Sequence, residues 1–414
     1  MSNNSDFDTA DIKIFKLVDL CSDVLDCPHS TPEWLSTGVR VIRNFNIKDG
    51  ALDFTNGFFV DEETYELRVR RGAPEAGDIV ISREAPMGVA ALVPDGLKCC
   101  LGQRLVLLKV DRSKCDPRYL LFALMSDYVQ TQFRRADTTG STVSNLAIPD
   151  LKEIRIPIVE GQVEAGELLD LIQSSILLNK KINDNLHHMM ATLYDYWFTQ
   201  FDFPDDNGMP YRSSGGKMVW NEELKKCIPD KWECVRLDDI LIKNVVEIAP
   251  FESMPTIDLS VMPSDSIALT TLNDSRKFNT NLYEMNEGDL LFGGIRPYLH
   301  KAGIAPCSGA VAGTVRSFQV QRPDDYNFAL FTLCSKAMFN YAESVSTGTR
   351  MPTVSSNDLL ERRVAYNPDI SARFNSINVR GTIINNVQDC LALQSLRDWL
   401  LPMLMNGQAT VRQP

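Results

Sequence analysis

One long stretch, residues 168–203, constrains the fold of this chain more than any other. Its residues recur at alternating steps of four and three, the heptad pattern of a helix that keeps one stripe against a partner helix. The positions of this predicted seam are Leu168, Ile172, Ser175, Asn179, Ile182, Leu186, Met189, Leu193 and Tyr196. No proline lies between Ile158 and Phe203 to break the helix. A helix over residues 162–198 is roughly 55 Å long at about 1.5 Å per residue, which predicts a spacer.

The chain also contains an internal repeat whose parts recur in the same order. GDIVIS at residues 77–82 matches GDLLFG at 288–293, and YLLFALMSDYVQTQF at 119–133 matches FALFTLCSKAMFNYA at 328–342. TGSTVSNLAIPDL at 139–151 matches TGTRMPTVSSNDL at 347–359 without a gap. A second long helix is predicted over residues 370–405. Since each helix carries an apolar stripe, we expect the two helices to pair.

The predicted fold is α+β, with two similar mixed α/β domains separated by two long antiparallel helices in an internal pseudo-twofold repeat. The expected boundaries are a first globular domain at 1–159, a long helix at 160–203, a linker at 204–230, a second globular domain at 231–367 and a C-terminal long helix at 368–414.

Composition limits the class of protein. The chain has 414 residues, 44% hydrophobic and 23% charged, which is ordinary for a soluble protein of two or three domains. It shows no signal peptide, no apolar run near the roughly 18 residues of a membrane span, and no metal-like spacing among its 10 cysteines. These features predict a cytoplasmic protein. The net charge of −12 argues against indiscriminate binding to nucleic acid, which depends on phosphate neutralisation, but is compatible with a local basic face.

Catalytic motifs are missing from the sequence. There is no Walker A sequence, no GxGxxG, no GxSxG and no Asn-Pro-Pro-Tyr or Asp-Pro-Pro-Tyr tetrapeptide of adenine methyltransferases. His187 and His188 lie in the long helix without a neighbouring cluster of acids or cysteines. We therefore predict no catalytic residue and no metal ligand in this chain.

A duplicated domain on a rigid spacer suits a ligand that repeats at a fixed interval. Duplex DNA repeats at about 34 Å per turn. A duplicated scaffold that binds two protein partners is the alternative, and the architecture alone leaves it open.

Arginines after the repeated Gly-Asp turns are the first candidates for DNA contact. Arg83 and Arg296 each follow such a turn and a short apolar strand, and arginine suits bidentate contact with guanine or with phosphate. The simpler interpretation is a surface arginine in a solvated turn. The other candidates are Arg40, Arg43, Asn44, Arg68, Arg70, Arg71, Arg276, Lys277, Tyr298, His300 and Lys301.

Two Gly/Ser/Thr loops complete the candidate DNA-binding set. Thr139 and Ser141 lie in one loop, and Thr349 and Arg350 in the other. Their amides and hydroxyls suit phosphate oxygens, while helix C-capping at the loop glycines explains the same pattern and is compatible with it.

One segment resembles a known family. LLNKKINDNLHHMMATLYDYWFTQFDFPDDNG and PYRSSGGKMVWNEELKKCIPDKWE, within residues 177–233, closely resemble the central region of the specificity subunit of type I restriction-modification enzymes. At the level of architecture the resemblance covers nearly the whole chain.

The resemblance implies a non-catalytic subunit with two target-recognition domains, each reading half of an asymmetric, bipartite DNA sequence. It implies that the helices set the spacing and dock two copies of an adenine-N6 methyltransferase subunit. An ATP-dependent restriction and translocase subunit would complete the enzyme. S-adenosylmethionine, ATP and magnesium would then bind the partner subunits, with no cofactor in this chain.

Apolar residues of the first long helix that lie off the predicted seam are the candidates for partner docking. If one helix face pairs with the other helix, these side chains remain exposed. They are Leu169, Ile176, Met190, Trp197 and Phe198.

Overall fold

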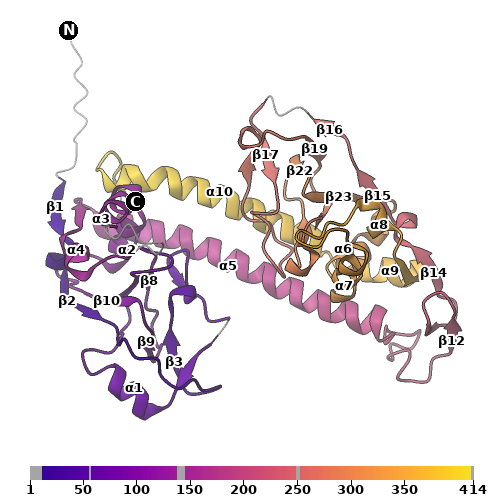
Figure 1. Ribbon diagram of the computed structural model, residues 1–414, viewed down its shortest axis with the longest axis horizontal. Helices are drawn as coiled ribbons and strands as arrows, with labels where there is room; N and C mark the ends of the chain where they lie inside the picture. Colours follow the sequence, from indigo (N-terminus) through magenta and orange to yellow (C-terminus); the bar gives the residue numbers. More distant parts are fainter. Residues whose placement is uncertain (1–11, 56, 138–144, 249–251, 412–414) are drawn as a thin grey trace, which may run out of the picture. The chain divides into compact units, whose positions relative to one another are not determined.

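The computed structural model describes residues 12–55, 57–137, 145–248 and 252–411. The chain divides into two compact units, of which unit 1 comprises residues 1–174 and 394–414 and unit 2 comprises residues 175–393. Each unit combines a β-rich body with part of each of two long helices (Figure 1).

Unit 1 is built on an antiparallel sheet of order β2-β10-β7-β8, beside a smaller sheet of order β6-β3-β9. Strand β1 pairs with β11, and β4 with β5. The elements are β1 (Lys13–Lys16), β2 (Cys21–Asp26), β3 (Val39–Ile42), β4 (Ile47–Lys48), β5 (Ala51–Leu52), β6 (Phe59–Val60), α1 (Glu62–Arg68), β7 (Ile79–Ser82), β8 (Ala90–Leu92), β9 (Cys99–Leu101), β10 (Leu105–Val110), α2 (Pro117–Met125), α3 (Asp127–Ala136), α4 (Ile148–Glu153), β11 (Arg155–Ile158) and the first part of α5 (Gln162–Tyr194).

Unit 2 repeats this plan with a sheet of order β15-β23-β20-β21 and a second sheet of order β16-β19-β22-β17-β18. Its elements are β12 (Met218–Asn221), β13 (Lys226–Pro229), β14 (Glu233–Arg236), β15 (Leu241–Asn244), β16 (Glu247–Ile248), β17 (Pro255–Ile257), β18 (Asn273–Asp274), β19 (Leu282–Met285), β20 (Leu290–Gly293), β21 (Ala302–Ile304), β22 (Gly309–Ala312), β23 (Val315–Val320), α6 (Tyr326–Leu333), α7 (Lys336–Val345), α8 (Ser356–Leu360), β24 (Arg363–Tyr366), α9 (Pro368–Asn375) and α10 (Val379–Met405).

The repeat predicted from the sequence is present in both units. The two four-stranded sheets have the same order when their strands are numbered along each half, and each unit adds one parallel pair, β3 with β9 and β17 with β22. The helix pair α2–α3 corresponds to α6–α7, and α4 corresponds to α8. The stretch predicted as a linker, residues 204–230, carries the hairpin β12–β13.

The first long helix matches its predicted start and length closely. Helix α5 has 33 residues, about 50 Å at 1.5 Å per residue, and continues into a π-helical turn at Asp195–Thr199. The second long helix is shorter than predicted, because α9 ends at Asn375 and the 27-residue α10 begins only at Val379. The buried amide of Asn327 donates hydrogen bonds to the carbonyls of Phe374 and Ile377 and so stabilises this break.

Half of the predicted seam of α5 is displaced by one residue, while the predicted seam residue Ile172 is buried at 5% exposure. The displaced positions recur every seven residues and are 0–9% exposed: Leu169, Ile176, Asn183, Met190 and, just after the end of α5, Trp197. The predicted seam residues Ile182 and Met189 are instead 37% and 69% exposed. The displacement arises because α5 packs on the bodies of the units as well as on α10, so the broader apolar surface decides which face is covered.

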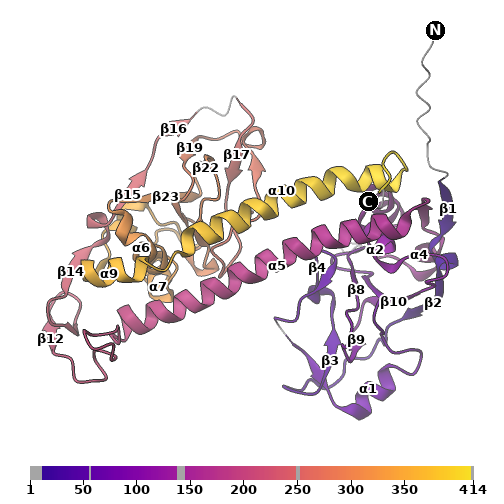
Figure 2. The same ribbon diagram turned by 180° about the vertical axis from the view of Figure 1, so that it is seen from behind.

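Within each unit, the segments of α5 and α10 lie side by side and run antiparallel (Figures 1 and 2). Within unit 2, the Cys390 thiol approaches the Ile176 carbonyl at 3.6 Å, and the Asn386 amide donates to the Asn183 side chain at 2.8 Å. Partner numbers fall on α10 as they rise on α5, as antiparallel pairing requires. Within unit 1, Arg397 donates to the side-chain oxygen of Gln173 at 2.7 Å.

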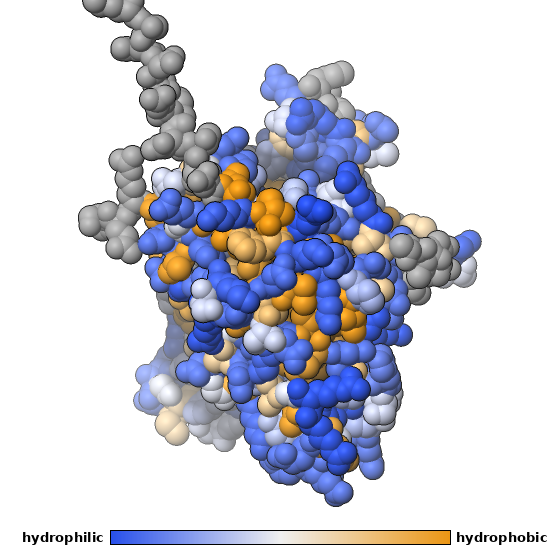
Figure 3. All heavy atoms as spheres, turned by 90° about the vertical axis from the view of Figure 1, so that its left-hand side faces the viewer, coloured by the Kyte–Doolittle hydropathy of each residue, from blue (hydrophilic) through white to orange (hydrophobic). Residues whose placement is uncertain are grey.

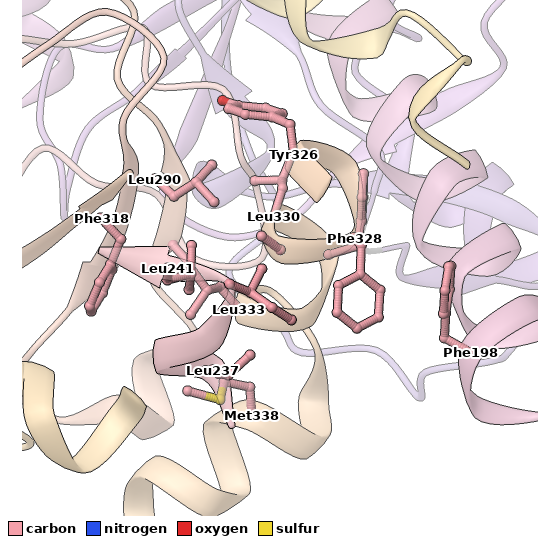
Figure 4. Packing of buried hydrophobic residues seen from close by; sticks show 14 of the residues in the cluster. Phe198, Leu237, Leu241, Leu290, Phe318, Tyr326, Phe328, Leu330, Leu333 and Met338 are labelled. Atoms are coloured by element: carbon pink, nitrogen blue, oxygen red, sulfur yellow. The ribbon is translucent and has the colours of Figure 1, made fainter. Parts of the chain in front are cut away.

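The largest core belongs to unit 2 and is rich in aromatic rings. Phe198, from the end of α5, packs against Phe328 of α6 with ring centroids 4.8 Å apart, and leucines of β15, β20 and α6 extend the cluster (Figure 4). This core ties the end of α5 to the body of unit 2.

Candidate nucleic-acid interface

The Gly-Asp turns of the two repeats stabilise the fold, because their carboxylates bind groups inside the same unit. In unit 1 the Asp78 carboxylate accepts a hydrogen bond from the Glu75 amide and pairs with Lys109 at 2.8 Å. In unit 2 the Asp289 carboxylate accepts from the Asn286 amide and from the Ser317 hydroxyl. Both turns fix the start of a central strand, β7 or β20, and thereby the loop that follows it.

Arg83 follows β7 but does not project outward as predicted. Its side chain is 16% exposed, its Nε donates to the Leu146 carbonyl at 2.9 Å, and its guanidinium pairs with Asp26 at 3.3 Å. The prediction that Arg83 reaches from its loop towards DNA is therefore wrong, because internal acceptors hold the guanidinium inside unit 1.

The predicted equivalence of Arg83 and Arg296 is also wrong. The Arg83 amide donates to the carbonyl of Arg104, and the Gly294 amide makes the corresponding bond to Thr314, so Arg83 is equivalent to Gly294. Arg296 is equivalent to Ala85, since both precede a proline and both have positive φ, 53° and 44°. In unit 2 the Arg316 guanidinium takes the internal position, where its Nε donates to the Val354 carbonyl at 3.0 Å.

Arg296 lies on an exposed surface formed by two adjacent loops of unit 2. We define the unit 2 loop pair as residues 296–301 and 347–353. The Arg296 amide donates to the Pro352 carbonyl at 2.7 Å, and Ile295 forms a β-bridge with Thr353. The side chains of Arg296, Thr349 and Arg350 are exposed, and Tyr298 is 50% exposed. The structure thus brings four predicted DNA-contact residues together.

The other two predicted residues of the first loop hold it in place. The Nδ1 atom of His300 lies 3.0 Å from the Asp265 carboxylate, and its ring stacks on Phe339 at 4.7 Å. Lys301 donates to the Leu259 carbonyl at 2.7 Å. These contacts fix the backbone that presents Arg296 and Tyr298.

The prediction that Gly348 caps the preceding helix is wrong. Helix α7 ends at Val345 and its C-cap is Ser346, so Gly348, with φ of +94°, lies beyond the cap and shapes the loop itself. Gly140, Thr139 and Ser141 lie outside the described residues.

Arg276 and Lys277 are exposed but engaged with their own turn. Two nitrogens of Arg276 donate to the Asp274 carboxylate at 2.9 and 2.7 Å, and this hydrogen bonding lowers the pKa of Asp274. Lys277 donates to the Asn273 side chain at 3.1 Å.

In unit 1, the predicted residues around β3 lie against aromatic rings. The Arg40 guanidinium lies 4.8 Å from the ring centroid of Phe54 and 5.2 Å from that of Phe59, and Arg43 lies over three further rings. The Asn44 amide donates to the Ala85 carbonyl at 2.7 Å, which joins the turn after β3 to the loop after β7.

Arg43 and Asn44 also border a cavity of about 180 Å³ that sequence reasoning missed. Its other lining residues are Thr31, Pro32, Trp34, Gln103 and Arg104. The only sequence signal for this cavity was the Gly-Gln-Arg segment that ends at Arg104, between two predicted strands. In the structure Arg104 adopts positive φ.

The arginines at the end of α1 differ in role. Arg68 is 9% exposed, and its guanidinium donates to the carbonyls of Leu101 and Ser30, so it joins α1 to β9 and is not a surface contact. This corrects its predicted placement among DNA-contact residues. Arg70 and Arg71 are exposed.

The predicted partner-docking residues are buried within the chain, so their assignment to an exposed surface is wrong. Leu169, Ile176, Met190, Trp197 and Phe198 are 0–9% exposed, because they form the buried stripe of α5 and its continuation. The exposed apolar residues of α5 in unit 2 are instead Leu178, Ile182 and Met189.

An apolar groove of about 540 Å³ lies at one end of unit 1. It is lined by exposed Ile12 just before β1, exposed Ile14 of β1, Tyr128 of α3 and the last turns of α10. Figure 3 faces this end of unit 1 and shows hydrophobic residues gathered between hydrophilic ones. The exposed β1 residues carried no heptad signal, which is why the sequence did not identify this groove.

Within the described ranges, no group of histidine, cysteine and acidic side chains is arranged to hold a metal ion. No helix in the part of the chain that the structure describes is both long and apolar enough to cross a membrane. His187 lies half-buried in α5, where burial lowers the pKa of its imidazole.

The sequence of the chain is similar to those of known proteins. The family described as "Type I restriction modification DNA specificity domain" matches residues 32–188. The chain is 27% identical over 360 residues to the type I restriction enzyme MjaIX specificity subunit of Methanocaldococcus jannaschii, which covers 81% of this chain and 78% of the relative.

A solved structure shares the fold. The crystal structure of the type I restriction-modification S subunit from M. genitalium aligns with a TM-score of 0.53 at 13% identity, and covers 100% of this chain and 99% of that one. The family match and the sequence similarity to a specificity subunit do not favour a protein scaffold without DNA specificity. Residues 32–188 therefore match a type I restriction-modification DNA specificity domain, and the similarity of most of the chain to a specificity subunit gives it a role in DNA recognition.

Proposed function

We propose that each unit reads one half of an asymmetric, bipartite DNA sequence. The observation that carries this proposal is that equivalent positions of one repeated scaffold present different side chains. Ala85 and Arg104 of unit 1 correspond to Arg296 and Thr314 of unit 2. Because base recognition depends on the donors and acceptors at such positions, the two units suit two different half-sites.

The proposed contacts in unit 2 come from Arg296, Tyr298, Thr349 and Arg350 on the loop pair. Those in unit 1 come from Arg40, Arg43, Arg70 and Arg71. Asn44, His300 and Lys301 support these surfaces from inside through the hydrogen bonds described above. The net charge of −12 argues against indiscriminate attraction of DNA, so contact with DNA should depend on local basic residues such as these.

The same proposal assigns spacing and assembly to α5 and α10. Two adenine-N6 methyltransferase subunits dock on this chain, and an ATP-dependent restriction subunit completes the complex. Leu178, Ile182 and Met189 are exposed apolar residues suited to such docking. S-adenosylmethionine, ATP and magnesium belong to those partners, which carry the catalysis.

A methylation map of cells with and without this gene tests the proposal. We expect one interrupted, asymmetric adenine-methylation motif to disappear with the gene. Exchanging residues 12–155 for the same block of another specificity subunit should then change one half of the motif only. Loss of no motif, or a change in both halves after the exchange, contradicts the proposal.

A further inference from the structure

Arg43 occupies an aromatic box that holds its guanidinium in one place. Its central carbon lies 4.7 Å from the ring centroid of Phe58, 5.0 Å from that of Phe45 and 5.5 Å from that of Trp34. The rings also pack on one another, since Trp34 meets Phe58 edge-on at 4.9 Å and Phe45 lies 5.7 Å from Phe58. We call these three rings the aromatic box. Ring contacts cover the faces of a guanidinium and leave its N–H edge for hydrogen bonding.

The guanidinium N–H groups of Arg43 have no acceptor in the described part of the chain. Arg43 is half-buried, and no hydrogen bond or ion pair from its guanidinium is made to any residue that the structure describes. A guanidinium has five N–H donors, and partly desolvated donors gain free energy when an acceptor is supplied. The side chain is therefore positioned to bind a group from outside the chain.

The other side chains that line the cavity beside Arg43 show by elimination that Arg43 is the residue positioned to bind a group from outside. The other polar side chains of the cavity are engaged: Asn44 donates to Ala85, and Gln103 donates to Thr31 at 3.2 Å. The second cation of the lining, Arg104, pairs with Glu84 at 3.2 Å. Among the described residues of this lining, Arg43 is the cation without a carboxylate partner.

We propose that Arg43 is a specificity-determining residue of unit 1 and reads the O6 and N7 atoms of one guanine in the major groove. The inference rests on the proposed function. Guanine is the base that presents two adjacent acceptors in the major groove, and these match two parallel N–H donors of arginine. A phosphate contact tolerates a mobile cation, whereas a guanidinium held by three rings gains most from an acceptor pair of fixed geometry. Trp34, Phe45 and Phe58 are positioning residues.

Base analogues test this assignment on the full-length chain. Once the methylation map has given the unit 1 half-site, each guanine in it is replaced in turn by 7-deazaguanine, which lacks N7, or by hypoxanthine, which keeps O6 and N7. At one position, 7-deazaguanine should weaken binding by about 5-fold to 150-fold, the range for one bidentate contact. Hypoxanthine at that position should leave binding unchanged. The variant Arg43→Ala should be insensitive to both analogues there.

Two further variants separate base reading from charge. Arg43→Lys keeps the positive charge but loses the two parallel N–H donors of the guanidinium. It should therefore no longer discriminate between bases at the same position, while the salt dependence of binding stays the same. Phe58→Leu opens the aromatic box and should reduce discrimination in the same way. Lys98→Ala is the control, because Lys98 is an exposed cation of unit 1 that lies over Tyr65 and pairs with Glu62 outside the cavity. It should leave the analogue responses as in the wild type.

The outcomes are distinguishable. Equal weakening of Arg43→Ala on cognate and scrambled duplexes, with a shallower salt dependence, would identify a phosphate contact and overturn the assignment. A unit 1 half-site without guanine would overturn it as well. If the wild-type chain did not prefer the cognate duplex, the proposed function itself would fail. If Arg43→Ala does not fold, Arg43→Lys carries the same comparison.

Discussion

At the residue scale, the role of an arginine depends on the hydrogen-bond acceptors that surround its guanidinium. Arg83 is surrounded by the Leu146 carbonyl and the Asp26 carboxylate, whereas the side chain of Arg296 is exposed. Arg68 and Arg316 likewise use their guanidinium groups on internal carbonyls. Exposure and hydrogen bonding, rather than basic character alone, therefore separate structural arginines from candidate DNA contacts.

This difference predicts opposite effects of two alanine substitutions. Arg83→Ala removes the donor to the Leu146 carbonyl and one of the two partners of the partly buried Asp26, the other being His29, so it should lower the free energy of unfolding by about 1–3 kcal/mol. The Arg83→Ala variant should show the same salt dependence of DNA binding as the wild type. Arg296→Ala should leave the urea midpoint unchanged and weaken DNA binding. Urea titration and binding at several salt concentrations measure both effects, and a reversed pattern would restore Arg83 to the interface.

His187 predicts a pH dependence of stability. Burial, followed by the nearby His188, lowers the pKa of His187 in the folded chain from its usual value of 6.5. The unfolded chain therefore binds the proton more readily, and stability present above pH 6.5 should be lost as the pH falls below it. His187→Phe should lose less stability than the wild type between pH 7 and pH 5. The control His188→Gln alters the exposed neighbour, and urea midpoints at the two pH values provide the measurement.

At the element scale, a buried amide pair connects α5 and α10 within unit 2. Asn183 is 0% exposed, and its side-chain oxygen accepts from Asn386 at 2.8 Å, while its Nδ2 atom has no partner among the described residues. Such a pair favours one register of two helices over the alternatives.

The amide pair makes a double substitution informative. Asn386→Ala leaves the Asn183 oxygen buried without a donor and should cost about 1–3 kcal/mol of stability. Replacing both residues with leucine removes both polar groups and should restore most of that loss. A double-mutant cycle from urea titrations measures the coupling, and additive losses would show that the two amides act independently.

Substitutions at two adjacent methionines of α5 allow an effect on partner docking to be measured separately from an effect on folding. Met189 is 69% exposed and Met190 is 4% exposed. Met189→Glu should abolish co-purification with the methyltransferase subunit while the circular dichroism spectrum and melting temperature stay the same. Met190→Glu buries a charge and should unfold unit 2. Retained co-purification by Met189→Glu would exclude this face of α5 from the docking surface.

At the scale of the whole molecule, the two long helices are the helices and strands that both units share in the part of the chain that the structure describes. Each runs through unit 1 and unit 2, with the division at residues 174–175 on α5 and 393–394 on α10. A change of length at these positions alters both helices without entering either body.

This division predicts how the recognised sequence responds to insertion. Four added residues in each helix at these points add about 6 Å of rise. Since a turn has about 3.6 residues, the residues after the insertion face nearly the same direction as before. The non-specific gap should lengthen by nearly two base pairs, at about 3.4 Å each, with both half-sites unchanged. A methylation map of cells with the variant gives the gap. An unchanged gap with retained methylation would show that the helices do not set the distance.

Local sequence patterns predicted the repeat, the central strands β7 and β20, and the start of α5 at Gln162. These features follow from the order of apolar and turn residues along the chain, so neighbouring residues suffice to predict them. The family resemblance likewise came from one continuous segment.

Contacts between residues distant in sequence decided the remaining features. The equivalence of Arg83 with Gly294 depends on hydrogen bonds to Arg104, Thr314, Leu146 and Val354, which lie in other strands and loops. The buried face of α5 depends on the bodies against which it packs, and the break before α10 depends on Asn327 in α6. A heptad pattern offers two neighbouring stripes, and an arginine after a strand has several rotamers. Only the tertiary surroundings, which bury one stripe and supply the acceptors, choose between them.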